Sequence, residues 1–132
     1  MQAGPEISTT LRYIVGAFYG FINRRAEALR WDISRECSAA KDDMELSILY
    51  FVHDGAVVRF NRVGIKTRYF RKEGGQGSVD KRRAAHEIAA RKLAERYPAF
   101  GFLHRKANGI LDFTLRYITS KSSGEVARLA AT

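Results

Sequence analysis

Cysteine is almost absent from this sequence, and its scarcity excludes several kinds of site. The 132 residues contain one cysteine, Cys37, so no internal disulfide can form and no cysteine cluster can hold a metal ion. A single thiol suits a reducing compartment, which favours the cytoplasm, or association with a nucleoid or nucleus, as the location. We expect Cys37 to be a packed thiol on a helix, because no base is evident beside it.

Long hydrophobic runs are also missing. The longest early apolar run, residues 14–22, is short. Arg12 precedes this run and no cleavage site is evident, so no secretion signal is predicted. A membrane-spanning helix needs about 20 predominantly apolar residues, and no run in the sequence approaches that length. The sequence therefore predicts a soluble protein without a membrane span.

Acidic residues are outnumbered. The sequence has 14 Asp and Glu against 23 Lys and Arg, which gives a net charge of +9. Such an excess favours a polyanionic partner, with nucleic acid first and an anionic membrane surface second. A basic protein whose charge serves only solubility is the alternative.

Catalytic groupings are missing as well. The three histidines, His53, His86 and His104, stand far apart, and none has a histidine partner at i,i+4 spacing. We expect His53 to hydrogen-bond the adjacent Asp54, His86 to be a satisfied core residue, and His104 to join a basic patch. Because no nucleophile–base pair, carboxylate pair or ligand cluster emerges, the sequence predicts a non-enzymatic protein without a metal or cofactor.

The first third of the chain predicts a long amphipathic helix. After a disordered lead at residues 1–6, the helix runs from a polar cap near residues 8–10 to about residues 37–40. Apolar residues at helical spacing form its core face: Leu11, Val15, Phe18, Ile22, Leu29 and Ile33. Gly16 and Gly20 on the reverse face permit close approach of a second helix, within the chain or in a homodimer, although two merely tolerated glycines are an equal alternative.

The middle of the chain predicts three consecutive antiparallel strands, at residues 45–53, 56–61 and 65–72. Residues 48–52 are continuously apolar or aromatic, as in a central strand. The Asp54-Gly55 pair that follows is a strong hairpin signal. These strands would form an antiparallel meander.

Alternation along this meander predicts two unlike faces. Val58 and Phe60 would lie on an apolar face, and Arg59, Lys66 and Arg68 on a basic one. The basic face would serve either as a solvated edge or as a ligand surface.

A second helix is predicted from Val79 to about Tyr97, where Pro98 ends it. Its core face and its outer face are distinguished by residue type. The core face holds Val79, His86, Ala90, Leu93 and Tyr97, and the outer face carries Lys81, Arg91 and Lys92.

The remainder of the chain predicts one more strand. Residues 99–106 predict a short helical turn, and Asn108-Gly109 is a turn signal. Alternation over residues 110–119 predicts a fourth strand, with a helix as the alternative, and residues 120–132 form a polar linker and tail. The predicted order is α-β-β-β-α-β, in a single α+β domain over residues 7–119.

Residues 74–96 are the stretch that points most directly to a ligand. Their glycine-rich loop lacks both the Gly-Lys-Ser/Thr of a P-loop and the spacing of a dinucleotide fingerprint. The loop leads into a helix whose first turn holds Lys81, Arg82 and Arg83 against a single acid, Asp80. Helix N-termini bind anions through their exposed N–H groups. Cations crowded at such an end therefore predict a phosphate group nearby.

Residues 75–93 resemble the second helix of double-stranded RNA-binding domains, whose fold is α-β-β-β-α. In that family a Gly-x-Gly loop precedes a helix that opens with Lys-Lys-x-Ala-Lys-x-x-Ala-Ala. Here Gly75-Gln76-Gly77 precedes Arg82-Arg83-Ala84-Ala85-His86-Glu87-Ile88-Ala89-Ala90. The resemblance implies that Lys81, Arg82 and Arg83 grip phosphates across an RNA major groove, while the first helix and first hairpin loop contact minor grooves.

These features together predict a non-enzymatic protein that binds nucleic acid, RNA or a structured duplex rather than a DNA sequence, through backbone phosphates. The predicted contacts are Lys81, Arg82, Arg83, Arg91 and Lys92 on the second helix, Gly77 and Ser78 before it, and Arg59, Lys66 and Arg68 on the sheet. Two alternatives stay open. One is a protein-interaction module, an adaptor or chaperone-like dimer for an acidic partner, and the other is a basic structural subunit of a virus or ribonucleoprotein particle.

Overall fold

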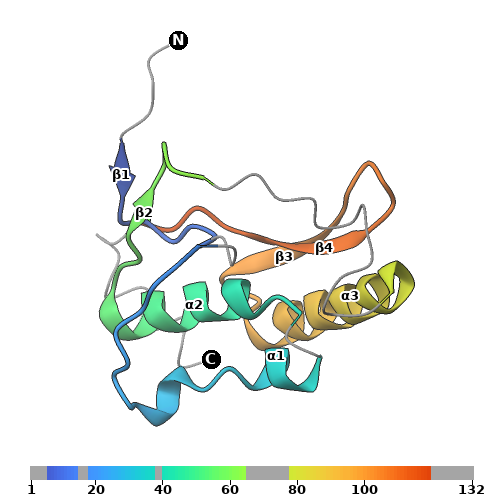
Figure 1. Ribbon diagram of the computed structural model, residues 1–132, viewed down its shortest axis with the longest axis horizontal. Coiled ribbons are helices and arrows are strands. Elements are labelled where there is room, and N and C mark those ends of the chain that lie inside the picture. The colour runs from blue at the N-terminus through green and yellow to red at the C-terminus, as the bar shows by residue number, and fades with distance from the viewer. Residues whose placement is uncertain (1–5, 15–17, 38–39, 65–77, 120–132) are drawn as a thin grey trace.

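The computed structural model describes residues 6–14, 18–37, 40–64 and 78–119, and these form an α+β fold (Figure 1). The helices and strands follow one another as β1 (Ile7–Ser8), the 3-10 helix η1 (Glu27–Leu29), α1 (Asp32–Glu36), α2 (Asp42–Asp54), β2 (Arg59–Phe60), α3 (Val79–Arg96), β3 (Gly101–Arg105) and β4 (Leu111–Leu115). β1 pairs with β2 and β3 pairs with β4, both antiparallel. The predicted α+β class is confirmed, but the order of elements agrees only in part.

The second helix is confirmed as α3. Ser78 caps it, because its side chain accepts a hydrogen bond from the Lys81 N–H, and the Tyr97 N–H closes the last turn on the Leu93 carbonyl. Ala90 and Leu93 are fully buried, as predicted, and Ala89 lies beside them in the core. Pro98 follows directly and cannot continue the helix.

The predicted central strand at residues 45–53 is wrong, because this segment lies in the helix α2. Its core contacts fall at helical spacing, with Met44, Ile48 and Phe51 all buried. Gly55 adopts a φ of 77°, and its N–H donates to the Phe51 carbonyl at 2.9 Å. A left-handed glycine after the last helical turn is a common C-cap, so Asp54-Gly55 ends a helix and does not form the predicted hairpin.

The predicted single long N-terminal helix is also wrong, because among the described residues of its span only η1 and α1 are helical. Leu11 and Ile33 are buried as expected, but they reach the core from separate segments, an extended one and α1. The Leu11 N–H donates to the Ile118 carbonyl at 2.9 Å, a β-bridge contact that a helix could not make. Gly20 lies outside any helix, so no helical Gly16–Gly20 interface forms there, and Gly16 lies outside the described residues.

The second predicted strand is reduced to the short β2. It pairs with β1, and its predicted neighbour at residues 45–53 is helical. Val58 and Phe60 are exposed and Arg59 is half-buried, so the predicted alternation is kept, but the apolar side chains lie at the surface. The third predicted strand, residues 65–72, lies outside the described residues.

A β-hairpin follows α3. The helical turn predicted over residues 99–106 is wrong, since β3 occupies most of it, whereas the fourth strand is confirmed as β4. Gly109, at a φ of 81°, donates its N–H to the Lys106 carbonyl at 2.8 Å, which confirms the predicted turn. The register places Phe102 opposite Thr114 and Leu103 opposite Phe113.

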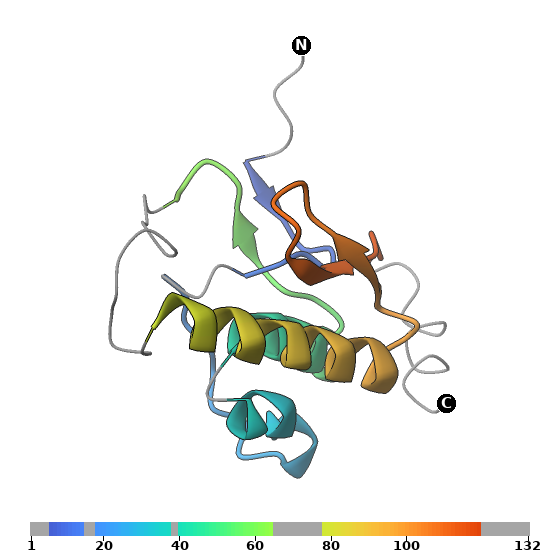
Figure 2. The ribbon, with the colours of Figure 1, turned by 90° about the vertical axis from the view of Figure 1, so that its right-hand side faces the viewer.

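The core lies between the hairpin and the helices. Both views show the β3–β4 hairpin on one side of α3 and α1 on the other, with α2 packed beside them (Figures 1 and 2). Ile48 and Phe51 of α2, Leu93 of α3 and Phe113 of β4 belong to one buried cluster. Among the described residues, no helix has the length and apolar character needed to cross a membrane.

Candidate nucleic-acid interface

The predicted cations of α3 lie on its first turns and its outer face. Lys81 and Arg83 are exposed, and Arg82 is half-buried. The Ser78 hydroxyl accepts the Lys81 N–H at 3.4 Å, so Ser78 acts here as the helix cap. Arg91 is exposed two turns further along. Lys81, Arg83 and Arg91 therefore form the exposed basic strip of α3, whereas Nε of Arg82 is buried.

The other described candidates make contacts within the protein. Lys92 forms an ion pair with Glu36 of α1, and this hydrogen bond raises the pKa of Lys92 and lowers the pKa of Glu36. Arg59 donates from its guanidinium to the Tyr13 carbonyl at 3.2 Å. Both contacts join separate segments of the chain. The three remaining candidates, Lys66, Arg68 and Gly77, lie outside the described residues.

A buried carboxylate holds three basic side chains close to the first turns of α3. Asp112 of β4 forms ion pairs with Lys41 and Lys106, and its Oδ1 lies 3.2 Å from Nε2 of His86. Only 6% of the Lys41 side chain and 9% of the Asp112 side chain are exposed. His86, predicted to be a satisfied core residue, is half-buried, and Asp112 supplies its hydrogen-bond partner. The amino-acid sequence does not indicate that Lys41 and Lys106 pair with Asp112, because Lys41 lies 71 residues from Asp112.

These contacts set the charge state of the cluster. Burial alone would raise the pKa of Asp112, but hydrogen bonds from His86, Lys106 and Lys41 outweigh it and hold the pKa of that carboxyl well below its usual range. Burial lowers the pKa of Lys41, and Asp112 opposes that shift. Asp112 is the one acidic residue between positions 101 and 117. Because the negative charge of Asp112 is paired inside the protein, the groups that the hairpin exposes are basic and aromatic.

Two aromatic rings on and beside the hairpin are each paired with an arginine. The Arg116 guanidinium lies 5.7 Å from the ring centroid of Phe102, and the Arg12 guanidinium lies 5.7 Å from that of Tyr117. Phe102 is 45% exposed and Tyr117 is 67% exposed. Sequence reasoning identified the alternation around Tyr117 but not this arrangement, because Phe102 and Arg12 come from other parts of the chain.

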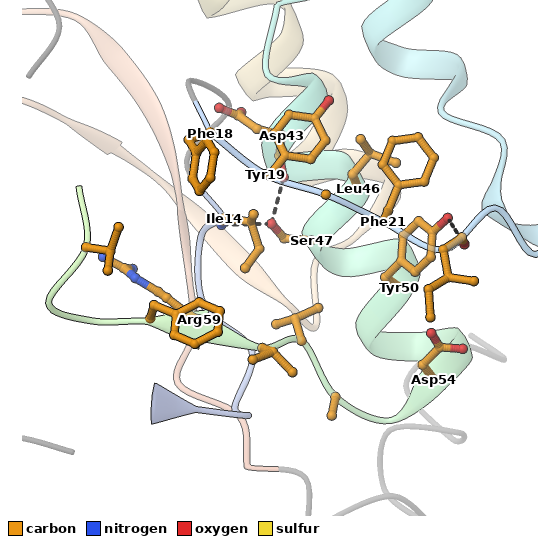
Figure 3. Close-up of a pocket in the computed structure, with 17 residues that line it drawn as sticks. Ile14, Phe18, Tyr19, Phe21, Asp43, Leu46, Ser47, Tyr50, Asp54 and Arg59 are labelled. Atoms are coloured by element: carbon orange, nitrogen blue, oxygen red, sulfur yellow. Dashed lines mark hydrogen bonds between the residues drawn. The ribbon is translucent and has the colours of Figure 1, made fainter. Parts of the chain in front are cut away.

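A second feature, an apolar groove of about 410 Å³, lies between α2, β2 and the extended segment that begins at Phe18 (Figure 3). Hydrogen bonds at both ends of the groove hold the N-terminal segment against α2. The Ile14 N–H donates to Ser47 Oγ at 3.0 Å, and the Tyr50 hydroxyl donates to the Ile22 carbonyl at 2.9 Å.

Aromatic rings form much of the groove wall. Tyr19 and Phe21 stack with their ring centroids 6.1 Å apart, and Phe21 and Tyr50 lie 5.8 Å apart. Phe18 is 74% exposed at the rim. Nothing in the predicted long helix indicated this groove, because a helix would have turned Phe18 and Ile22 toward the core.

The remaining titratable candidates have structural contacts. Nδ1 of His53 lies 2.7 Å from Asp54, which confirms the predicted hydrogen bond. Cys37 is buried, as predicted for a packed thiol, and burial raises its pKa. Within the described part of the chain, no three His, Cys, Asp or Glu side chains group in a way that could hold a metal ion.

Comparison with known proteins gives no relative. No protein-family model, no curated protein and no solved structure matches this chain.

Proposed function

We propose that this protein binds nucleic acid through backbone phosphates, with RNA or a structured duplex as the preferred form. One observation carries the proposal: the half of α3 that bears the exposed cations Lys81 and Arg83 is joined to the hairpin, whose turn end carries the exposed basic residues His104, Arg105 and Lys106. The His86–Asp112 contact and the hydrogen bond from the Leu111 N–H to Glu87, at 3.4 Å, join the turn end of the hairpin to the first half of α3. Basic side chains from both elements thus face the same end of the molecule.

The chemistry of this end suits phosphate. Lys81 and Arg83 are exposed beside a helix N-terminus, where backbone N–H groups also attract anions. Lysine and arginine supply most of the affinity of proteins for nucleic-acid backbones. The preference for RNA rests on the resemblance of residues 75–93 to the second helix of double-stranded RNA-binding domains.

A salt titration tests the proposal. The double variant Lys81→Gln/Arg83→Gln should weaken binding to duplex RNA about equally for all sequences. It should also reduce the slope of log affinity against log salt by roughly 1.4 to 1.8, the contribution of two phosphates. The matched control is Arg30→Gln/Arg35→Gln, which removes the same charge from two exposed residues, the C-cap of η1, where Arg30 pairs with Glu27, and Arg35 of α1. An equal loss in both variants, or no loss in the first, would contradict the assignment to α3.

A second candidate function is a protein-interaction module, and the apolar groove favours it. Phe18, Ile22, Phe60 and Val63 are each more than half exposed and all line the groove. Clustered exposed apolar side chains often mark interaction sites. The module would take an apolar peptide segment of a partner. Phe18→Ser/Phe60→Ser should abolish binding to apolar peptides and leave binding to RNA unchanged. The candidate fails if wild-type protein binds no such peptide.

A further inference from the structure

We infer that the β3–β4 hairpin is a stacking surface for the unpaired bases of single-stranded nucleic acid. This inference rests on the proposed nucleic-acid binding and assigns it a second surface with a different ligand feature. The α3 cations would hold phosphates of any strand, whereas the hairpin would distinguish unpaired from paired nucleotides.

The positions of the side chains follow from the register of the hairpin. Phe102 lies opposite Thr114, so these two side chains share a face of the hairpin. Arg116 directly follows β4, which ends at Leu115. The Arg116 guanidinium is placed over the Phe102 ring. Tyr117 follows the end of β4 and is paired in the same way with Arg12. Arg12 is brought there by the β-bridge between Leu11 and Ile118.

Two aromatic rings, each with an arginine beside it, suit unpaired nucleotides, which have an exposed base plane and a negatively charged phosphate. Bases stack on exposed aromatic side chains and on guanidinium planes, and this stacking tolerates any base because every base has a π-face. Bases within a duplex already stack on their neighbours, so they cannot use such a surface without being unpaired. Both rings are substantially exposed, at 45% for Phe102 and 67% for Tyr117.

Charge complementarity identifies the partner as a polyanion. His104, Arg105, Lys106 and Arg116 are exposed along the hairpin. Asp112, the one acidic residue between positions 101 and 117, is buried and paired with Lys41 and Lys106. A ligand that carries planar rings on a negatively charged backbone satisfies both the aromatic and the basic groups. An acidic peptide would satisfy only the basic ones.

The test compares removal of a ring with removal of a charge. Phe102→Leu and Tyr117→Leu should each weaken binding to a labelled single-stranded RNA by about tenfold, since one stacked base contributes that order of affinity. The salt slope should stay at the wild-type value, because no cation is lost. Binding to duplex RNA should also be unchanged. Tyr117 lies outside the strands, so its variant keeps the test usable if Phe102→Leu disturbs the hairpin.

Phe18→Leu is the matched control, because it removes an exposed ring from the groove and should leave RNA binding intact. An abasic strand of the same length should bind the wild type and both hairpin variants equally. If Phe102→Leu and Tyr117→Leu bind single strands as tightly as wild type, the stacking surface is overturned, while loss of binding in Lys81→Gln/Arg83→Gln would still support the proposed function. If wild-type protein binds no nucleic acid, both fail. Displacement of RNA by polyglutamate as readily as by RNA itself would also overturn stacking.

Discussion

Lys41 and Asp112 form an ion pair inside the protein, although 71 residues separate them in the sequence. Lys41 caps the start of α2 in a left-handed conformation, with a φ of 61°, and Asp112 lies in β4. The pair thus joins the start of α2 to the β3–β4 hairpin. Burying two charges costs free energy that only close pairing and further hydrogen bonds offset, and Asp112 obtains these from His86 and Lys106.

The two partners should differ in their sensitivity to substitution. Asp112→Asn leaves the Lys41 ammonium buried without its carboxylate, and such a change typically costs about 3–5 kcal/mol of unfolding free energy. Lys41→Met removes the buried cation itself, and Asp112 keeps His86 and Lys106, so we expect roughly half that cost or less. Denaturant unfolding of both variants measures the difference.

The double variant Lys41→Met/Asp112→Asn serves as the control for this asymmetry. It should be more stable than Asp112→Asn alone, since no unpaired ammonium remains in the interior. Equal destabilisation by the two single variants would show that Lys41 is not the charge that depends most on Asp112.

Acid should remove the contribution of Asp112. Its pKa is lowered in the folded protein, so its stabilisation is fully present above the unfolded pKa of about 3.9 and is lost as the pH falls below that value. The difference in unfolding free energy between wild type and Asp112→Asn should therefore narrow steadily below about pH 4. Urea titrations at several pH values measure it. A constant difference down to pH 2 would contradict the lowered pKa.

The α2 segment shows why part of the fold could not be predicted. A short continuous apolar run fits a buried strand and a buried helix equally well, because each places apolar side chains in the core. In α2 the burial of both Ile48 and Phe51, three residues apart, distinguishes a helix from a strand. That burial is known only once the rest of the core is known. Gly55 adds to the ambiguity, since an Asp-Gly pair with positive φ serves both a hairpin and a helix C-cap.

By contrast, α3 and β4 are predictable because local signals agree with tertiary contacts. Ser78 and Pro98 mark the two ends of α3. Apolar and polar residues alternate along β4, as they do in a strand with one buried face. The basic strip of α3 follows from these signals. The Asp112 cluster does not, because Lys41, His86 and Lys106 approach it from separate elements.

Alkali should destabilise the protein through Tyr97. Burial, followed by the negative charge of Glu45, raises the pKa of Tyr97 to about 12. The unfolded chain releases this proton near pH 10 and the folded chain retains it, so stability should fall as the pH rises from about 10 to 12. Tyr97→Phe has no proton to release and should lose less stability over that range. Parallel curves for the two proteins would contradict the raised pKa.

Gly101 should be the glycine least tolerant of a side chain among those that the structure describes. A Cβ at Gly101 would lie 2.3 Å from the Phe113 ring and 2.6 Å from the Thr114 carbonyl oxygen. Phe113 is fully buried and cannot move aside easily, so Gly101→Ala should cost about 1–3 kcal/mol through overpacking. Gly20→Ala is the matched control, because a Cβ there meets no atom within 4 Å. Gly20→Ala should leave the melting temperature nearly unchanged. If the melting temperature falls by a similar amount in both variants, the β3–β4 pairing is looser than the contact at Gly101 requires.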